Sequence, residues 1–190
     1  MGGFETAQAL AHAESTVVVP DRFSRATEAQ LDSLAEPLVY IAEQGDLNVY
    51  RGLSYEGKQR FLRDFWRHHD PAPGSQQNEA ESRFYQRIAL ANRRYREGGG
   101  AQIPGWRTDR GRVFIRHGDP DEVRREPQSG PDLPWEAWKY TGREELKFVF
   151  MDRTRLGNYS LIYSDDRLER NPIDWMRLLS PEAVREITTF

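Results

Sequence analysis

The sequence predicts an α+β fold in which three N-terminal helices precede an antiparallel sheet of about four strands and short C-terminal helices. Two observations predict it. Up to about residue 96, apolar residues recur at the three- and four-residue spacing of amphipathic helices. From about residue 112 to residue 163, short apolar runs lie between Gly, Pro, Asn and Asp. We therefore expect a single domain over residues 26–190, preceded by an extended arm over residues 1–25.

The first helix is expected to begin after Thr27. Thr27 and Gln30 match a capping box, in which each side chain accepts a hydrogen bond from the other residue's backbone N–H. Leucines then recur at helical spacing as far as Ile41. Because Pro37 has no N–H and crowds the preceding turn, it should end or kink this helix near Glu36.

Two further helices are expected before the sheet. One starts near Ser54, where side chains four residues apart form a wide apolar face, and ends before the proline-rich loop at 70–75. The other covers about 78–96, where apolar side chains recur every three or four residues. The three glycines at 98–100 end it.

The second half of the chain is expected to form the sheet. Its runs of β-branched and aromatic residues cover 112–116, 135–140, 146–151 and 159–163. Because short turns separate the last three runs, those strands should pair antiparallel. Proline, serine and acidic residues within 172–182 then open the C-terminal helices.

The composition excludes several kinds of partner and site. A formal net charge of −3 attracts no polyanion, so no nucleic acid partner is expected. The absence of Cys rules out disulfides and thiolate metal sites. No apolar run approaches the roughly 20 residues of a membrane helix, so no transmembrane segment is expected. No intact signal peptide is recognisable either.

Arginine strongly outnumbers lysine. Of the 27 basic side chains, only Lys58, Lys139 and Lys147 are lysine. Arginine binds carboxylates through two parallel hydrogen bonds and is enriched, with aromatic residues, at protein interfaces. A GC-rich genome would produce the same excess without any interface, so both explanations stay open.

The segment Gly105-Trp106-Arg107-Thr108-Asp109 is the most distinctive in the chain. It predicts a structural corner between a helix and the first strand, with a ligand site as the alternative. Gly105 would permit a positive φ, and Trp106 would anchor the corner with its large ring. Thr108 and Asp109 would bond nearby backbone N–H groups. The residues expected to have such structural roles are Gly105, Trp106, Thr108, Asp109, Gly111, Gly118 and Pro120.

This corner and its surroundings resemble one protein family. The Gly-Trp-Arg-Thr-Asp segment, the following residues 112–122 and further matches over about 30–165 are similar to the GWxTD-domain proteins of bacteria. Members usually read Gly-Pro-Pro where this chain has Gly118-Asp119-Pro120. The resemblance implies a periplasmic or otherwise extracytoplasmic protein, and it implies neither a catalytic activity nor a cofactor.

Acidic residues offer the main candidate for catalysis. Those that could meet at one end of the sheet are Asp109, Asp119, Asp121, Glu122 and Asp152. Two carboxylates about 5 to 10 Å apart can cleave a glycosidic bond. However, turn formation next to Gly and Pro explains the aspartates without a substrate, and arginines lie close enough to pair with them.

The sequence signals for metal binding and for nucleophilic catalysis are weaker than those of the acidic residues. His68 and His69 are adjacent, and neighbouring helical residues point about 100° apart, which disfavours a shared metal ion. The chain has no Cys nucleophile and no Gly-x-Ser-x-Gly segment. We therefore expect no catalytic, cofactor-binding or metal-binding residues.

The expected function is that of a protein-interaction module without catalytic activity. The chain would be a soluble accessory subunit of a bacterial envelope or membrane-associated complex, with other protein subunits as partners. The residues of the arm and its end that are expected to contact a partner are Val17, Val18, Val19, Arg22 and Phe23.

Two other functions stay open. One is a carbohydrate- or peptide-binding module that uses Trp106, Trp135 and Trp138 as stacking surfaces. Because Trp135 and Trp138 are three residues apart on a predicted strand, they should point to opposite faces of the sheet. The other is a hydrolase built on the acidic residues.

Overall fold

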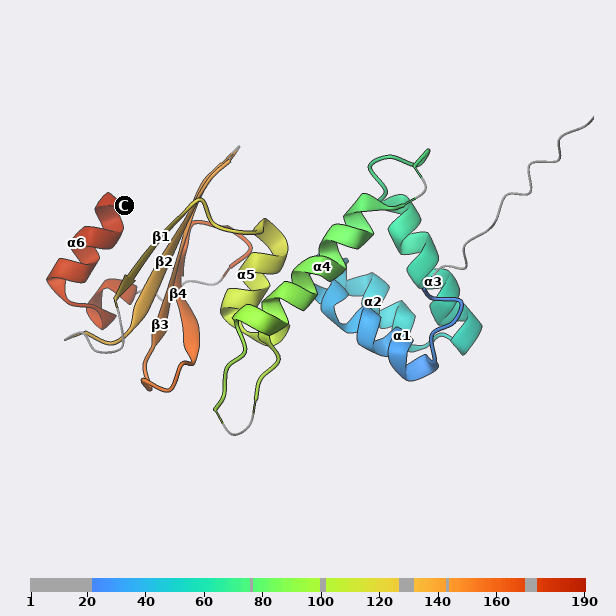
Figure 1. Ribbon diagram of the computed structural model, residues 1–190, viewed down its shortest axis with the longest axis horizontal. Helices are drawn as coiled ribbons and strands as arrows, with labels where there is room; N and C mark the ends of the chain where they lie inside the picture. Colours follow the sequence, from blue (N-terminus) through green and yellow to red (C-terminus); the bar gives the residue numbers. More distant parts are fainter. Residues whose placement is uncertain (1–21, 76, 100–101, 127–131, 143, 170–173) are drawn as a thin grey trace, which may run out of the picture.

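The computed structural model describes residues 22–75, 77–99, 102–126, 132–142, 144–169 and 174–190. Its helices and strands are α1 (Glu28–Ala35), η1 (Glu36–Tyr40), α2 (Gln44–Arg51), α3 (Tyr55–His68), α4 (Glu79–Arg94), η2 (Gly105–Arg107), α5 (Asp109–His117), β1 (Glu122–Glu126), β2 (Trp135–Thr141), β3 (Glu145–Asp152), β4 (Tyr159–Ser164), η3 (Trp175–Leu178) and α6 (Pro181–Thr189). Helices α1, α2 and α3 lie at one end of the molecule and the sheet with α6 lies at the other, while α4 runs between them (Figure 1). The predicted α+β class is confirmed.

The predicted helix starts are confirmed by their hydrogen bonds. Thr27 and Gln30 form the reciprocal capping box at the start of α1. Ser54 caps α3 by accepting the N–H of Gly57. α1 ends at Ala35, and Pro37 lies in the 3-10 helix η1 that follows, as its missing N–H requires. These signals are local, because each capping side chain and its partner are three residues apart.

Helix α2 is not predicted by the sequence pattern. Only Leu47 and Tyr50 of its eight residues are buried, so no repeated apolar stripe marks it. No side chain caps its start either. Its position depends on contacts with α3 and η1.

The first predicted strand is wrong, because residues 112–116 lie within helix α5. Thr108 starts this helix by accepting the N–H of Gly111. Val113, Phe114 and Ile115 are all buried, and a short continuous apolar run fits a buried helix as well as a buried strand. The elements that pack against this run, α4, η2, β4 and η1, therefore decided the outcome.

The first strand is instead β1, which sequence patterning misses. The sheet order is β1-β2-β3-β4, and every neighbouring pair is antiparallel. β1 lies at an edge and reads Glu-Val-Arg-Arg-Glu, with its charged side chains largely exposed. Charges on an edge strand hide its β signal and discourage pairing with other chains. The other three predicted strands are confirmed.

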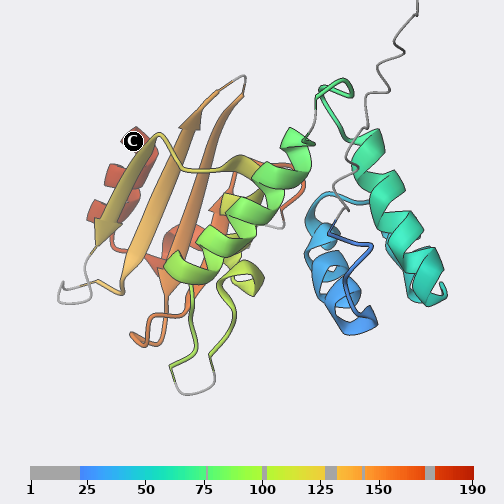
Figure 2. The same cartoon turned by 45° about the vertical axis from the view of Figure 1, so that its right-hand side comes forward.

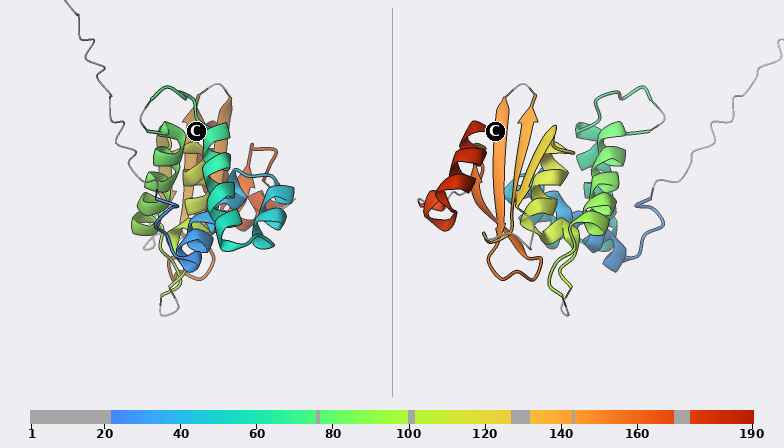
Figure 3. Two further views of the ribbon diagram at one scale, coloured as in Figure 1. Left: turned by 90° about the vertical axis from the view of Figure 1, so that its right-hand side faces the viewer. Right: turned by 60° about the vertical axis from the view of Figure 1, so that its left-hand side comes forward.

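Helices cover both faces of the sheet (Figures 2 and 3). Trp138, Phe148 and Phe150 pack in the core on the side of α4 and α5. Trp135 and Met151 pack in a second core with η3 and α6. The prediction that Trp135 and Trp138 point to opposite faces is thus confirmed. Each is 1% exposed, so neither offers a stacking surface to a sugar.

The first core continues from the sheet into the N-terminal helices. It joins Phe148 of the sheet to Phe84 of α4, Leu62 of α3 and Leu31 of α1. Phe23 also belongs to it and is only 2% exposed. The packed domain therefore extends at least three residues before the boundary expected at residue 26.

Two of the expected partner contacts lie against the chain's own domain. Phe23 is buried in the first core, which leaves it no surface for a partner, so that expectation is wrong for Phe23. Arg22 pairs with Glu81 at 3.0 Å and stacks over the ring of Tyr85. The remaining three, Val17, Val18 and Val19, lie outside the described residues.

Candidate functional site

The Gly-Trp-Arg-Thr-Asp segment lies where α4, η2 and α5 meet. A Cβ atom on Gly105 would lie 1.9 Å from the backbone oxygen of Ala91 in α4. A Cβ on Gly111 would lie 1.8 Å from the backbone oxygen of Gly105. The positive φ expected for Gly105 is wrong, since its φ is not in the left-handed region. Glycine is needed at both positions because the backbones of η2 and α4, and of α5 and η2, approach too closely for a side chain.

Trp106 connects η2, in which it lies, to α4 and η1. Its backbone N–H donates to the side-chain oxygen of Asn92 in α4, and its backbone carbonyl accepts the hydroxyl of Tyr40 in η1 at 2.9 Å. The rings of Tyr40 and Trp106 also meet edge-on, 6.1 Å apart. The corner therefore joins helix to helix, which corrects the predicted helix-to-strand junction. The half-buried ring is further covered by the guanidinium of Arg107, 4.9 Å from its centroid.

Thr108 performs the capping role predicted for it. Its hydroxyl accepts the N–H of Gly111 at 3.0 Å and donates to the carbonyl of Gly105 at 2.9 Å. The residue is 5% exposed, so both bonds form away from water. One side chain thus connects η2 to the first turn of α5.

The Asp109 carboxylate contacts the edge of the sheet. One carboxylate oxygen accepts the N–H of Leu161 in β4 at 2.7 Å, and the other pairs with Arg112 at 2.7 Å. The carboxylate of Glu97 accepts the N–H of Tyr159, two residues earlier on β4. The two carboxylates therefore occupy alternate N–H groups along the outer edge of β4, where another strand could otherwise pair.

Arg110 is the most enclosed charge of the motif region, and sequence reasoning does not single it out. Its side chain is 11% exposed and pairs with Glu97 at 2.8 Å and Glu136 at 3.3 Å. The ring centroid of Tyr159 lies 3.9 Å from its guanidinium. Its position directly after the motif is the only sequence signal. Nothing in the spacing identifies its partners, because the fold brings them together.

Gly118 and Pro120 follow α5. Gly118 has a φ of 87°, which favours glycine. Its backbone N–H donates to the carbonyl of Phe114 at the end of α5. Its carbonyl accepts the hydroxyl of Tyr140. Pro120 is half-buried beside β1 and β2. The contacts of Gly118 are therefore structural.

Asp119 and Asp121, two of the acidic residues that could have formed a catalytic site, have other partners. Asp119 forms an ion pair with Arg94, and Asp121 accepts the backbone N–H and hydroxyl of Thr141. Those hydrogen bonds hold the pKa of the Asp121 carboxyl below its usual range. Glu122 is exposed on β1.

Asp152 is fully buried at the end of β3. Burial works to raise the pKa of its carboxyl, but hydrogen bonds from Thr154, Gly157 and Leu156 together hold it below its usual range. A general acid at neutral pH needs the opposite shift. The geometry of Asp152 is therefore that of a turn-forming residue.

The histidine pair is also used locally. The Nδ1 atoms of His68 and His69 lie within hydrogen-bond distance of the carbonyls of Asp64 and Phe65, one turn earlier in α3. Across the described residues, no group of three or more His, Cys, Asp or Glu side chains is arranged to hold a metal ion.

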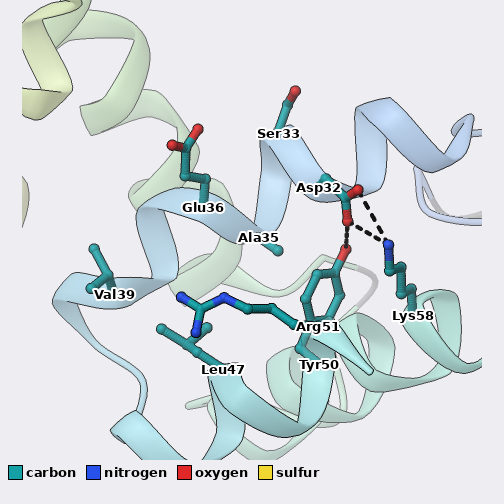
Figure 4. A pocket seen from close by; sticks show the side chains of 9 residues that line it. All are labelled: Asp32, Ser33, Ala35, Glu36, Val39, Leu47, Tyr50, Arg51 and Lys58. Carbon is teal, nitrogen blue, oxygen red and sulfur yellow. Dashed lines mark hydrogen bonds and ion pairs between the residues drawn. The ribbon is translucent and has the colours of Figure 1, made fainter. Parts of the chain in front are cut away.

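A groove beside the corner is the best candidate for a binding site (Figure 4). It has a volume of about 380 Å³ and lies between α1 with η1 on one side and α2 with α3 on the other. Its lining residues are Asp32, Ser33, Ala35, Glu36, Val39, Leu47, Tyr50, Arg51 and Lys58. η1 separates the groove from the corner, since Glu36 and Val39 line the groove while Tyr40 contacts Trp106.

One end of the groove is polar. Asp32 accepts the hydroxyl of Tyr50 at 3.0 Å and pairs with Lys58 at 2.9 Å (Figure 4). The amine of Lys58 also binds Glu28 at 2.9 Å. Hydrogen bonding to Lys58 lowers the pKa of Asp32, and burial is the main cause that raises the pKa of Tyr50. All three side chains are thus occupied by one another.

The other end of the groove is apolar. Ala35 and Leu47 are buried at its floor, and Val39 at its rim is 46% exposed. Arg51 extends from α2 toward Leu47 and Val39 (Figure 4). The groove therefore combines an apolar floor with a cation, as sites that take a side chain of another molecule do.

His117, at the end of α5, predicts a pH dependence of stability. Burial lowers the pKa of its imidazole below the ordinary 6.5, although Asp166 lies 3.4 Å away and opposes the shift. Nearby Arg87 and Arg116 add to the lowering. The folded state thus disfavours the proton more than the unfolded state does. Stability should be fully present above pH 6.5 and should decline as the pH falls below it, by at most about 1.4 kcal/mol per pH unit from this group.

Urea unfolding of the wild type and His117→Gln at pH 7.5 and pH 5.5 measures this contribution. We expect the wild type to lose more stability than the variant between the two values. Equal losses would show that His117 does not titrate differently in the two states.

Comparison with known proteins identifies the family but no closer relative. The sequence profile of the GWxTD domain matches residues 4–177. A search of curated proteins gives no match, and a search of solved structures gives none. Among the described residues, no helix is both long and apolar enough to span a membrane. Because the profile covers most of the chain, this protein belongs to the GWxTD domain family.

Proposed function

We propose that this chain is a protein-interaction module without catalytic activity and that it binds a partner segment in the groove between η1 and α2. The observation that carries the proposal is the groove itself, which has an apolar floor, an exposed valine and an arginine. The motif beside it has structural contacts throughout, and four of the five candidate acids have partners of their own.

The setting is also a proposal. We propose an accessory subunit of an extracytoplasmic, envelope-associated complex in bacteria, supported by the resemblance to an exported family. Fractionation of the cells that make the protein, followed by immunoblotting, checks the compartment. Recovery with cytoplasmic markers alone would contradict this setting but would leave groove binding open.

Site-specific photocrosslinking in those cells tests the function. Ser33 lines the groove and is exposed, so it can be replaced by a photoreactive phenylalanine derivative. Glu186, exposed on α6 at the far end of the molecule, is the matched control position. We expect a protein adduct from position 33 and a much weaker one from position 186.

The same experiment in the Val39→Asp background shows whether the groove is responsible. Val39 is exposed, so a carboxylate there should remove apolar contact without disturbing the core. We expect the adduct at position 33 to be lost. Equal adducts at both positions, or an adduct that the Val39→Asp change leaves intact, would contradict the proposed function.

A further inference from the structure

We propose that the partner segment binds the groove through a carboxylate held by Arg51, with an aliphatic side chain of the same segment on the apolar floor. The inference rests on the proposed function and names the chemistry that the groove recognises. The ligand is an acidic peptide segment with an Asp or Glu next to Leu, Ile or Val, or a chain end with the same features.

The ion pairs of the groove leave Arg51 as the available cation. Lys58 is held by Glu28 and Asp32. Glu36 on the opposite wall forms an ion pair with Arg107 from the corner. Arg51 donates to the side-chain oxygen of Asn48 at 2.8 Å, and no carboxylate of the described residues lies within ion-pair distance of it.

The geometry of Arg51 suits a carboxylate. A guanidinium has five N–H donors in a plane, and two of them match the two oxygens of a carboxylate. Its hydrogen bond to Asn48 uses one nitrogen and leaves donors on the others. The side chain extends along the groove rather than away from it (Figure 4). A bound carboxylate would therefore lie beside the apolar floor.

The acidic wall limits the charge of the ligand. Asp32 and Glu36 line the same groove, and the amine of Lys58 is already bound to two carboxylates. A phosphate group with two negative charges would meet these acids with only one available cation. A single carboxylate matches that one cation, which favours an acidic peptide.

The apolar floor accounts for the second feature of the ligand. Val39 is 46% exposed at the rim, and Leu47 and Ala35 lie below it. A volume of about 380 Å³ is near the lower end of the range for ligand sites, so it takes one or two side chains rather than a large surface. An aliphatic side chain next to the carboxylate would cover Val39 and remove its exposed surface from water.

Selection from a displayed library of random 12-residue peptides tests the inference on the full chain. We expect the selected peptides to be enriched in Asp or Glu adjacent to an aliphatic residue. Fluorescence anisotropy with the best peptide then measures Kd for the wild type, Arg51→Gln and Arg51→Lys. We expect binding about tenfold weaker or more for Arg51→Gln. Arg51→Lys should be intermediate, because it keeps the charge but not the planar donor pair.

A double-mutant cycle identifies the interacting pair. A second peptide carries Gln in place of the acidic residue, and we expect Arg51→Gln to have little further effect on its affinity. Arg185→Glu is the charge control, since Arg185 is an exposed helical arginine on α6, far from the groove. Its Kd should match that of the wild type, and circular dichroism confirms that each variant is folded.

The outcomes separate the two proposals. Selected peptides that compete for the groove and lose affinity with Val39→Asp support the proposed function. If such peptides are not acidic, or if Arg51→Gln does not weaken their binding, the carboxylate inference is overturned and the proposed function stands. Selection of no peptide, or of peptides that bind Val39→Asp as tightly as the wild type, overturns both.

Discussion

Replacing Gly105 by alanine is expected to lower the free energy of unfolding by about 3 kcal/mol or more. The new Cβ would lie 1.9 Å from the backbone oxygen of Ala91 and 2.6 Å from its carbonyl carbon. These are backbone atoms of α4, so no side chain can rotate away. α4 and η2 would have to separate, which would loosen the packing around Ala91, now 0% exposed. Urea unfolding followed by circular dichroism measures the loss, and the melting temperature should fall by about 6 to 12 °C.

Gly74→Ala is the matched control for this effect. A Cβ on Gly74 would have no atom within 4 Å, so its stability should stay within about 0.5 kcal/mol of the wild type. Gly111→Ala should behave like Gly105→Ala, because its Cβ would lie 1.8 Å from the oxygen of Gly105. If Gly105→Ala were as stable as Gly74→Ala, the close approach of backbones would not explain the glycine of the motif.

Replacing Arg110 by alanine is expected to cost about 3 to 5 kcal/mol at pH 7. Glu97 and Glu136 are 6% and 12% exposed at their side chains, and both pair with Arg110. Without the guanidinium, the Glu97 carboxylate would be left buried with no cation against it. The space between Tyr95 and Tyr159 would also be left unfilled.

The pH dependence of this loss provides a specific signature. Burial already raises the pKa of Glu97, although Arg110 opposes the shift. Removing Arg110 should raise that pKa further, so the folded variant would hold a proton that the unfolded chain releases. A raised carboxyl pKa gives stability at low pH that is lost as the pH rises. The deficit of Arg110→Ala should therefore be smaller at pH 4.5 than at pH 7, measured by urea unfolding at both values.

Arg107→Ala is the control for Arg110→Ala. The Arg107 side chain and its partner Glu36 are each 51% exposed, and exposed ion pairs contribute little to stability. We expect a loss of about 1 kcal/mol or less. Comparable losses in the two variants would argue against a special role for the buried cluster around Arg110.

These variants distinguish the structural role of the corner from the binding role proposed for the groove. Changes at Gly105 or Arg110 should lower stability, and they should affect binding only through the folded fraction. Changes at Arg51 or Val39 lie on exposed side chains and should lower binding with little effect on unfolding. Measuring both properties for each variant distinguishes a structural motif from a binding motif.

Sequence patterns predicted the elements whose signals are local. The capping residues Thr27 and Ser54 bond N–H groups three residues away, so their effect needs no distant partner. Strands β2 to β4 lie between turn residues and alternate between two buried faces, which made them recognisable as well. α5 was predicted as a strand because three consecutive apolar residues have no periodicity that separates helix from strand.

The sequence by itself determined the α+β class, the order of most helices and strands, the family motif and the absence of thiol chemistry. Only the tertiary structure decided what the motif does. Gly105 faces the backbone of α4, Asp109 binds the edge of β4, and Arg110 meets Glu97 and Glu136, all through contacts that spacing along the chain does not encode. The groove around Arg51 likewise exists only because α1, α2 and α3 pack together, and side chains distant in sequence share a site only once the core has formed.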